Sequence, residues 1–79
     1  MNPFVKNVEP LNDYKLKLHF ENGVNKVFDV SPYLNKGIFV ELKNKDYFQQ
    51  VSVVSGSIAW PNEQDFSYDT LYLLGTSLR

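Results

Sequence analysis

The chain has 79 residues and a formal net charge of −1, and it is 43 % hydrophobic, 22 % charged and 15 % aromatic. This mixture is typical of one folded domain and excludes a disordered tail. Because the chain has no cysteine and only one histidine, we expect no disulfide, no metal site and no cofactor. The charge is balanced and Arg79 is the only arginine, which argues against direct contact with nucleic acid.

The N-terminal region does not resemble a targeting segment. Residues 1–15 contain Pro3, Pro10 and several charges, which interrupt the apolar core that a signal peptide needs. The apolar runs elsewhere are shorter than the ~20 residues of a membrane-spanning helix. We therefore expect a cytoplasmic protein without membrane contact, folded as one domain over residues 1–79.

Alternation of apolar and polar residues predicts the first part of a sheet. Residues 4–9 predict a short strand, and 11–13 predict a turn because of their Asn and Asp. The clearest signal in the chain follows, because Tyr14, Leu16, Leu18 and Phe20 alternate with Lys15, Lys17, His19 and Glu21. This pattern indicates a strand with one buried face.

The segment Glu21-Asn22-Gly23 predicts a hairpin to a strand over residues 24–30. A two-residue Asn-Gly loop would divide the apolar residues between both faces. A three-residue loop with Gly23 in the left-handed region gathers them on one face, and a slip of one residue would undo this. We therefore predict the register that pairs Phe20 with Val24, Leu16 with Phe28 and Lys15 with Asp29.

Short helical turns are predicted next. Ser31 resembles an N-cap with Pro32 at the first helical position, and the turn ends at residues 35–37. A second helical face is formed by Ile38, Phe39 and Leu42, and Asp46 is expected to cap a turn that carries Tyr47 and Phe48.

The last third of the chain predicts a second hairpin and a helix. Residues 51–55 form a β-branched strand, Gly56 a tight turn, and 57–60 the return strand, which Pro61-Asn62 ends. Residues 64–66 are expected to be extended, and Ser67 to cap a helix that Gly75 stops. The predicted fold is α+β, an antiparallel meander of hairpins with short helices packed on one side, in the order β-β-β-α-α-β-β-α.

No catalytic constellation is apparent. The chain has no Gly-x-Ser-x-Gly motif, and His19 is expected to be solvated on the polar face of its strand. The carboxylates of Asp29, Asp65 and Asp69 each have a sufficient role in a turn or cap. A small ligand-binding or hydrolytic site using Asp29 or Asp65 near Trp60 remains an alternative, and it requires a carboxylate with a raised pKa in a hollow.

The one local cluster that combines a large ring, a rigid turn and polar groups is Trp60, Pro61, Asn62 and Asp65. Half-exposed aromatic residues are typical of binding surfaces. We therefore take Trp60, Asn62, Asp65 and Tyr72 as candidate partner-binding residues. The alternative is that the segment is a turn that closes the sheet, with Trp60 in the core.

Three runs of the sequence are distinctive: YKLKLHFENGVNKVFDVSPYLNKGIFVEL, FQQV and IAWPNEQDFSYDTLY. Through them the chain resembles the small bacterial family DUF2442, a domain of unknown function, over residues 3–73. The most specific elements are Phe20 with Gly23, Phe28-Asp29-Val30, Leu34, Leu42, Phe48, Trp60-Pro61-Asn62, Asp65, and Asp69 with Leu71-Tyr72. Members usually carry a glycine after Trp-Pro-Asn, where this chain has Glu63, a residue that tolerates a left-handed backbone poorly.

The resemblance implies an α+β fold like the N-terminal domain of relatives that continue into a helix-turn-helix domain, which we do not expect here. It implies no catalytic residue. Short members are often encoded beside a second small protein, in an arrangement that resembles toxin–antitoxin pairs.

We expect a non-enzymatic protein-interaction module that binds a gene-neighbour protein or a second copy of itself, with residues 4–9 or 51–55 as a free strand edge. The alternatives are an antitoxin-like component that acts on DNA only through a partner, and the small ligand-binding or hydrolytic domain.

Overall fold

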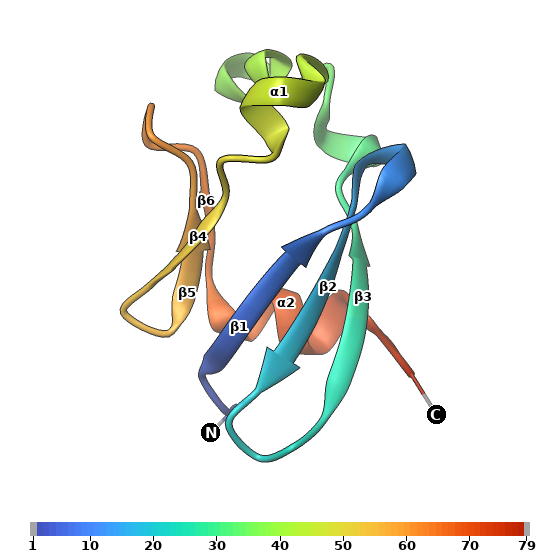
Figure 1. Ribbon diagram of the computed structural model, residues 1–79, viewed down its shortest axis with the longest axis vertical. Coiled ribbons are helices and arrows are strands. Elements are labelled where there is room, and N and C mark those ends of the chain that lie inside the picture. Colours follow the sequence, from blue (N-terminus) through green and yellow to red (C-terminus); the bar gives the residue numbers. More distant parts are fainter. Residues whose placement is uncertain (1, 79) are drawn as a thin grey trace.

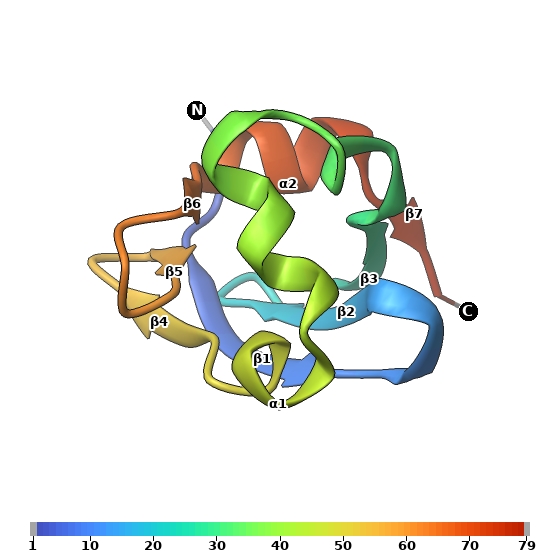
Figure 2. The same ribbon diagram turned by 90° about the horizontal axis from the view of Figure 1, so that it is seen from above.

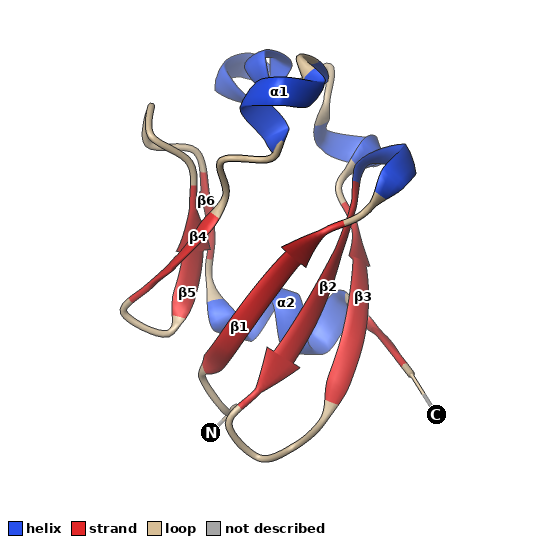
Figure 3. Cartoon of the chain, in the orientation of Figure 1, coloured by secondary structure: helices blue, strands red, loops and turns tan. Residues whose placement is uncertain are grey.

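The computed structural model describes residues 2–78 and contains two small antiparallel sheets with short helices around them (Figure 1). The expected α+β class is confirmed. Figure 2 shows the helical segment 37–48 crossing over the space between the two sheets. Strands form two separate groups when the chain is coloured by secondary structure (Figure 3).

The first sheet has the strand order β1-β2-β3-β7. Its strands are β1 (Val5–Pro10), β2 (Lys15–Phe20), β3 (Asn25–Asp29) and β7 (Thr76–Ser77). The alternation of β2 predicts its faces correctly, because Leu16, Leu18 and Phe20 are completely buried.

The register of the β2–β3 hairpin is the predicted one. Lys15 pairs with Asp29 and Leu16 with Phe28, and the Phe20 N–H donates to the Val24 carbonyl at 2.9 Å. Gly23 has a φ of +88°, the left-handed conformation that a three-residue loop requires. The need to collect the apolar side chains on one face therefore decides the register.

The second sheet has the order β4-β5-β6, from β4 (Ser52–Val54), β5 (Ser57–Ala59) and β6 (Asp65–Phe66). The two sheets meet where the Val5 N–H of β1 donates to the Gly56 carbonyl at 2.8 Å. A Cβ on Gly56 would lie 2.6 Å from the Phe4 ring, so this junction requires a glycine.

Two strands were missed by the sequence analysis. Residues 65 and 66 do not remain merely extended but pair with β5, so Pro61-Asn62 begins a loop and does not end the sheet. Residues 76 and 77 follow the last helix and pair with β3. Two-residue strands are too short to show any periodicity, and only their neighbours in space define them.

Two of the predicted caps are wrong by two residues. The first helical turn, the 3-10 helix Ser31–Tyr33, is supported by Asp29, whose Oδ1 accepts from the Ser31 N–H and hydroxyl at 3.0 and 2.6 Å. The α1 helix (Lys45–Phe48) is capped by Asn44, whose Oδ1 accepts from the Asp46 and Tyr47 amides. In each case an Asp or Asn two residues before the predicted cap accepts the backbone N–H groups at the start of the helix.

The remaining helices follow the sequence more closely. The expected turn at 11–13 is the 3-10 helix Asn12–Tyr14. Gly37–Lys43 is a further 3-10 helix, in which Leu42 is buried and Ile38 is exposed. Helix α2 (Tyr68–Leu74) has the predicted cap, because the Ser67 Oγ accepts from the Thr70 N–H at 3.2 Å.

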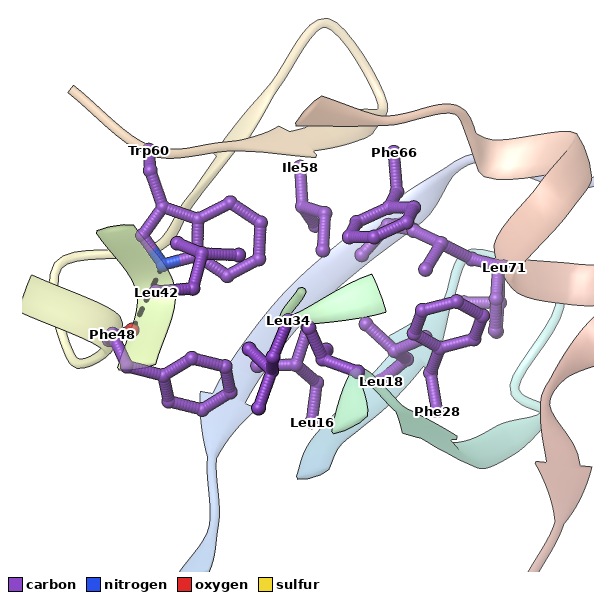
Figure 4. Packing of buried hydrophobic residues seen from close by; sticks show 13 residues of the cluster. Leu16, Leu18, Phe28, Leu34, Leu42, Phe48, Ile58, Trp60, Phe66 and Leu71 are labelled. Carbon is purple, nitrogen blue, oxygen red and sulfur yellow. Dashed lines mark hydrogen bonds between the residues drawn. The ribbon is translucent and has the colours of Figure 1, made fainter. Parts of the chain in front are cut away.

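The core is a single layer of 13 buried apolar residues between the two sheets and the helices (Figure 4). Its rings contact one another mostly edge to face, as between Phe28 and Phe66 at 5.0 Å and between Phe20 and Tyr72 at 4.9 Å. Such pairs add about 0.5–1.5 kcal/mol each beyond area burial. Ring packing therefore replaces the covalent links that many small domains use.

The β2–β3 loop and the β5–β6 loop have the same pattern of backbone hydrogen bonds. In the β2–β3 loop, Gly23 N–H donates to the Phe20 carbonyl at 2.9 Å. In the β5–β6 loop, Glu63 N–H donates to the Trp60 carbonyl at 3.1 Å, and Trp60 N–H to the Gln64 carbonyl at 2.9 Å. Glu63 accordingly has a φ of +75°, so it takes the place of the left-handed glycine.

Replacing Glu63 by glycine is expected to stabilise the protein. The substitution relieves a left-handed backbone that costs an L-residue about 1–2 kcal/mol, and part of the gain is offset by unfolded-state entropy. We expect the free energy of unfolding in urea to rise by roughly 0.5–1 kcal/mol. The matched control is Gly23→Ala, which should lower it by about 1 kcal/mol, since no atom lies within 4 Å of the added Cβ and only the backbone changes. An unchanged or lower stability for Glu63→Gly would contradict the argument.

Candidate functional site

Trp60 lies inside the core rather than on a surface. Its side chain is 3 % exposed, and its indole Nε1–H donates to the Phe48 carbonyl at 2.9 Å, drawn as a dashed line in Figure 4. The ring also contacts Phe48 and Phe66 at 5.8 and 6.1 Å between centroids. This is the alternative that the sequence left open, a turn that closes the sheet with the Trp in the core.

The turn that follows Trp60 is held by a network of polar side chains. Asn62 Nδ2 donates to both carboxylate oxygens of Glu41, at 3.0 and 2.8 Å, and the Asn62 N–H donates to the Tyr47 hydroxyl at 2.8 Å. The network joins the β5–β6 loop to the helical segment that covers the core. It assigns Asn62 a structural role.

Gln64 is the centre of this network, and the sequence analysis missed it. It is only 1 % exposed, its Nε2 donates to the Ile38 carbonyl and to Glu41 Oε1 at 2.9 Å each, and its Oε1 accepts from the Tyr47 hydroxyl at 2.6 Å. One signal could have found it. In a three-residue loop Gln64 is opposite Trp60, as Val24 is opposite Phe20, so both face the core.

The network is unsuited to acid–base chemistry. Hydrogen bonds from Asn62, and then from Gln64, hold the pKa of the Glu41 carboxyl below its ordinary value. A general acid or base near neutral pH needs a carboxyl whose pKa is raised. Among the residues that the structure describes, every buried side-chain nitrogen and oxygen has a partner. The network therefore acts as a brace and offers no reacting group.

The other two candidate residues do not join Asn62. Asp65 is exposed in β6. Tyr72 is on α2. Its ring contacts Phe20 and lies under the Lys26 ammonium, 4.0 Å from the ring centroid, and its hydroxyl accepts from Asn22 Nδ2 at 3.3 Å. Figure 1 shows the β5–β6 loop reaching toward α1 while α2 lies at the opposite end. The four predicted residues thus do not form one surface.

Asp29 does not have the properties that a small ligand-binding or hydrolytic site would require. It is exposed, and its pKa is lowered, chiefly by the hydrogen bond from the Ser31 hydroxyl, then by the Ser31 amide and the nearby Lys15 charge. A ligand or hydrolytic site was expected to have a raised pKa in a hollow. The direction of the pKa shift is the opposite one.

A shallow hollow does occur on the outer face of the first sheet. His19 is one of its lining residues. It is half-buried on the polar face that the alternation predicted, and its Nδ1 donates to Asn25 Oδ1. The hollow is lined by Asn7, Val8, Glu9, Lys17, His19 and Asn25. In the described part of the chain, no group of three or more His, Cys, Asp or Glu residues could hold a metal ion.

Three exposed apolar side chains lie near the C-terminus. Leu73 and Leu74 in the last turn of α2 are 69 % and 63 % exposed, and Leu78 beyond β7 is 45 % exposed. We call residues 73–78 the C-terminal segment. Its strand β7 is an edge of the first sheet, since only β3 pairs with it. The sequence contained a signal for this surface, because Leu71 and Tyr72 take the inward positions of α2 and leave the next two residues outside.

The fold and these surfaces define a small α+β domain braced by a Trp-Pro-Asn loop, with an apolar C-terminal edge. The family model for the protein of unknown function DUF2442 matches residues 5–77. The chain belongs to this family, as its resemblance implied. No curated protein and no solved structure matches it. Within residues 2–78, no helix is long and apolar enough to cross a membrane.

Replacing Gln64 by leucine tests the brace. The variant removes the hydrogen-bond partner of the Ile38 carbonyl and one partner of the half-buried Tyr47 hydroxyl, and each unpaired buried group costs about 1–3 kcal/mol. We expect the free energy of unfolding in urea to fall by roughly 2–4 kcal/mol. Gln50→Leu, at an exposed glutamine, is the matched control and should change it by less than about 0.5 kcal/mol. Equal effects for both variants would refute the role of Gln64.

The Asp29 turn should make stability depend on pH in acid. Its pKa lies below the ordinary value of 3.8, so the ionised carboxyl stabilises the fold above that value and loses this effect as pH falls through the lowered pKa. Asp29→Ala should therefore lower the urea midpoint at neutral pH and differ less from the parent near about pH 3. Ser52→Ala, at an exposed serine outside this turn, is the control and should give no such convergence. A difference for Asp29→Ala that stays constant with pH would argue against it.

Proposed function

We propose that this protein is a non-enzymatic protein-interaction module whose contact surface is the C-terminal segment. The observation that carries the proposal is the exposure of Leu73, Leu74 and Leu78 beside an unpaired strand edge. Large apolar side chains left exposed on a small domain favour a binding surface. The partner would be a second copy of the chain or the product of a neighbouring gene.

Charge distinguishes this surface from the exposed apolar residues Ile38 and Val40. Residues 70–78 carry no charged side chain. Ile38 and Val40, on the 3-10 helix Gly37–Lys43, are also exposed, but Lys36, Glu41 and Lys43 surround them in sequence. The fully buried centre of an interface is poor in charge, which favours the C-terminal segment.

The two strand edges expected from the sequence support the proposal less well. The strands at 4–9 and 51–55 are β1 and β4, and their ends are joined by the hydrogen bond from the Val5 amide to the Gly56 carbonyl. A partner strand would have to separate the two sheets there. The edge at β7 has no such neighbour in the described chain (Figure 2).

The absence of enzymatic activity is part of the proposal. Two carboxyls with shifted pKa values, Asp29 and Glu41, are both shifted downward by hydrogen bonds, which favours turn and brace roles over proton transfer. The Trp60 ring, which could have lined a ligand site, is packed in the core.

The product of the adjacent gene is the probe that tests the interaction. In calorimetric titration or co-purification, the purified chain should bind this protein or already occupy its surface with a second copy. The double variant Leu73→Lys/Leu74→Lys should weaken either association at least about tenfold, because burying unpaired lysines opposes apolar contact. Its matched control is Ile38→Lys/Val40→Lys, which places the same charges on the other exposed apolar site. A chain that binds neither partner, or that loses binding equally with both double variants, would refute the proposed surface.

A further inference from the structure

We infer that the β7 edge pairs with the β7 edge of a second copy of this chain, antiparallel about a two-fold axis that passes beside Ser77. This deepens the proposed function and rests on it, because it names the partner of the C-terminal segment. The two sheets would join as one continuous sheet, with β7 of each copy at the centre.

The register of β7 determines which backbone groups are free. Lys26 pairs with Ser77 and Val27 with Thr76, and the Leu78 N–H donates to the Asn25 carbonyl at 2.9 Å. Successive residues of an antiparallel strand direct their backbone groups to opposite sides. Because Leu78 is bonded toward β3, the N–H and carbonyl of Ser77 point away from it, toward solvent.

These free groups are complementary to themselves. Ser77 offers one donor and one acceptor side by side, and two antiparallel copies centred on Ser77 satisfy both pairs at once. A two-fold interface requires this self-complementarity. One residue pair adds only two backbone hydrogen bonds, so the exposed leucines must supply the buried surface and the affinity should be weak.

The other sheet edges are protected against such pairing. Proteins protect edges with charge, proline or a covering element. The β1 edge has Lys6, Glu9 and Pro10 and is joined at Val5 to the second sheet, and the β6 edge carries the exposed carboxylate of Asp65. The β4 edge has no charge and no proline, but β1 lies beside it. The Thr76-Ser77-Leu78 segment has no charge and no proline, and Figure 2 shows it at the margin of the molecule.

The lack of charge favours a second copy over an unrelated partner. Interfaces between different proteins usually select their partner through opposite charges. Residues 73–78 offer none, so no like charges within this segment oppose the meeting of two copies. The ammonium of the neighbouring Lys26 is held by the Tyr72 ring and carbonyl. Leu73 and Leu74 are exposed in the α2 turn that leads directly into β7.

The chain contains no cysteine, so a single introduced thiol can report this pairing. Directly opposed residues of a hydrogen-bonded antiparallel pair have Cα atoms about 5.5 Å apart, within the range that a disulfide spans. Under mild oxidation with diamide, Ser77→Cys should form a disulfide-linked dimer at least about tenfold faster than Ser31→Cys, a control at an exposed serine on another surface. Equal rates would overturn the proposed pairing.

Sedimentation equilibrium of the full chain, from micromolar to millimolar concentration, measures the same association without a label. We expect a reversible dimer that Ser77→Pro weakens at least about tenfold, because proline removes the free N–H, and that Ser77→Ala leaves unchanged. If Ser77→Pro does not fold, as circular dichroism would show, the cysteine variants decide. A strictly monomeric chain overturns the pairing. If that monomer still binds the adjacent gene product through Leu73 and Leu74, the proposed function stands, and if it binds nothing, both fail.

Discussion

The fold depends on one shared layer of apolar rings. Strands of two to six residues do not form stable sheets alone, and here neither sheet has a core of its own. Phe28 contributes from the first sheet, Trp60 and Phe66 from the second, and Phe48 from α1, and all of them contact within this layer. Removing water from this common surface is what keeps the two sheets together.

The layer determines how the polar residues can be used. Since Trp60 fills the space between β5 and α1, the turn after it must be held over the core, and Glu41, Tyr47 and Gln64 provide that support. The Glu41 carboxylate accepts hydrogen bonds from Asn62 and Gln64 in this support, and the Asp29 carboxylate accepts from Ser31 in its own turn. The surface that we propose for binding lies at the periphery. There Leu73 and Leu74 are exposed at the end of α2, and β7 is the edge strand of its sheet.

The candidate site was predicted less well than the fold, for a definite reason. Trp60, Asn62, Asp65 and Tyr72 were grouped by residue type and by proximity along the chain, but a large ring next to a proline turn is compatible with both a core and a surface. Which one holds depends on whether another element covers the ring, and here α1 does, through the Phe48 carbonyl. Gln64 was missed because residues 64–66 were expected only to be extended, and the three-residue loop that places Gln64 opposite Trp60 was not predicted.

The sequence by itself determined what short-range patterns encode: the α+β class, the buried face and register of the β2–β3 hairpin, the Ser67 cap and the family. The hairpin and the cap rest on residues only a few positions apart, where periodicity and turn chemistry act directly. The class and the family follow from several such local patterns along the chain. Only the tertiary structure decided that Trp60 is interior, that Gln64 is the centre of a brace, and that β6 and β7 are strands. Those outcomes depend on contacts between residues that are distant in sequence, such as Gln64 with Ile38 and Ser77 with Lys26, and packing of the whole chain selects them.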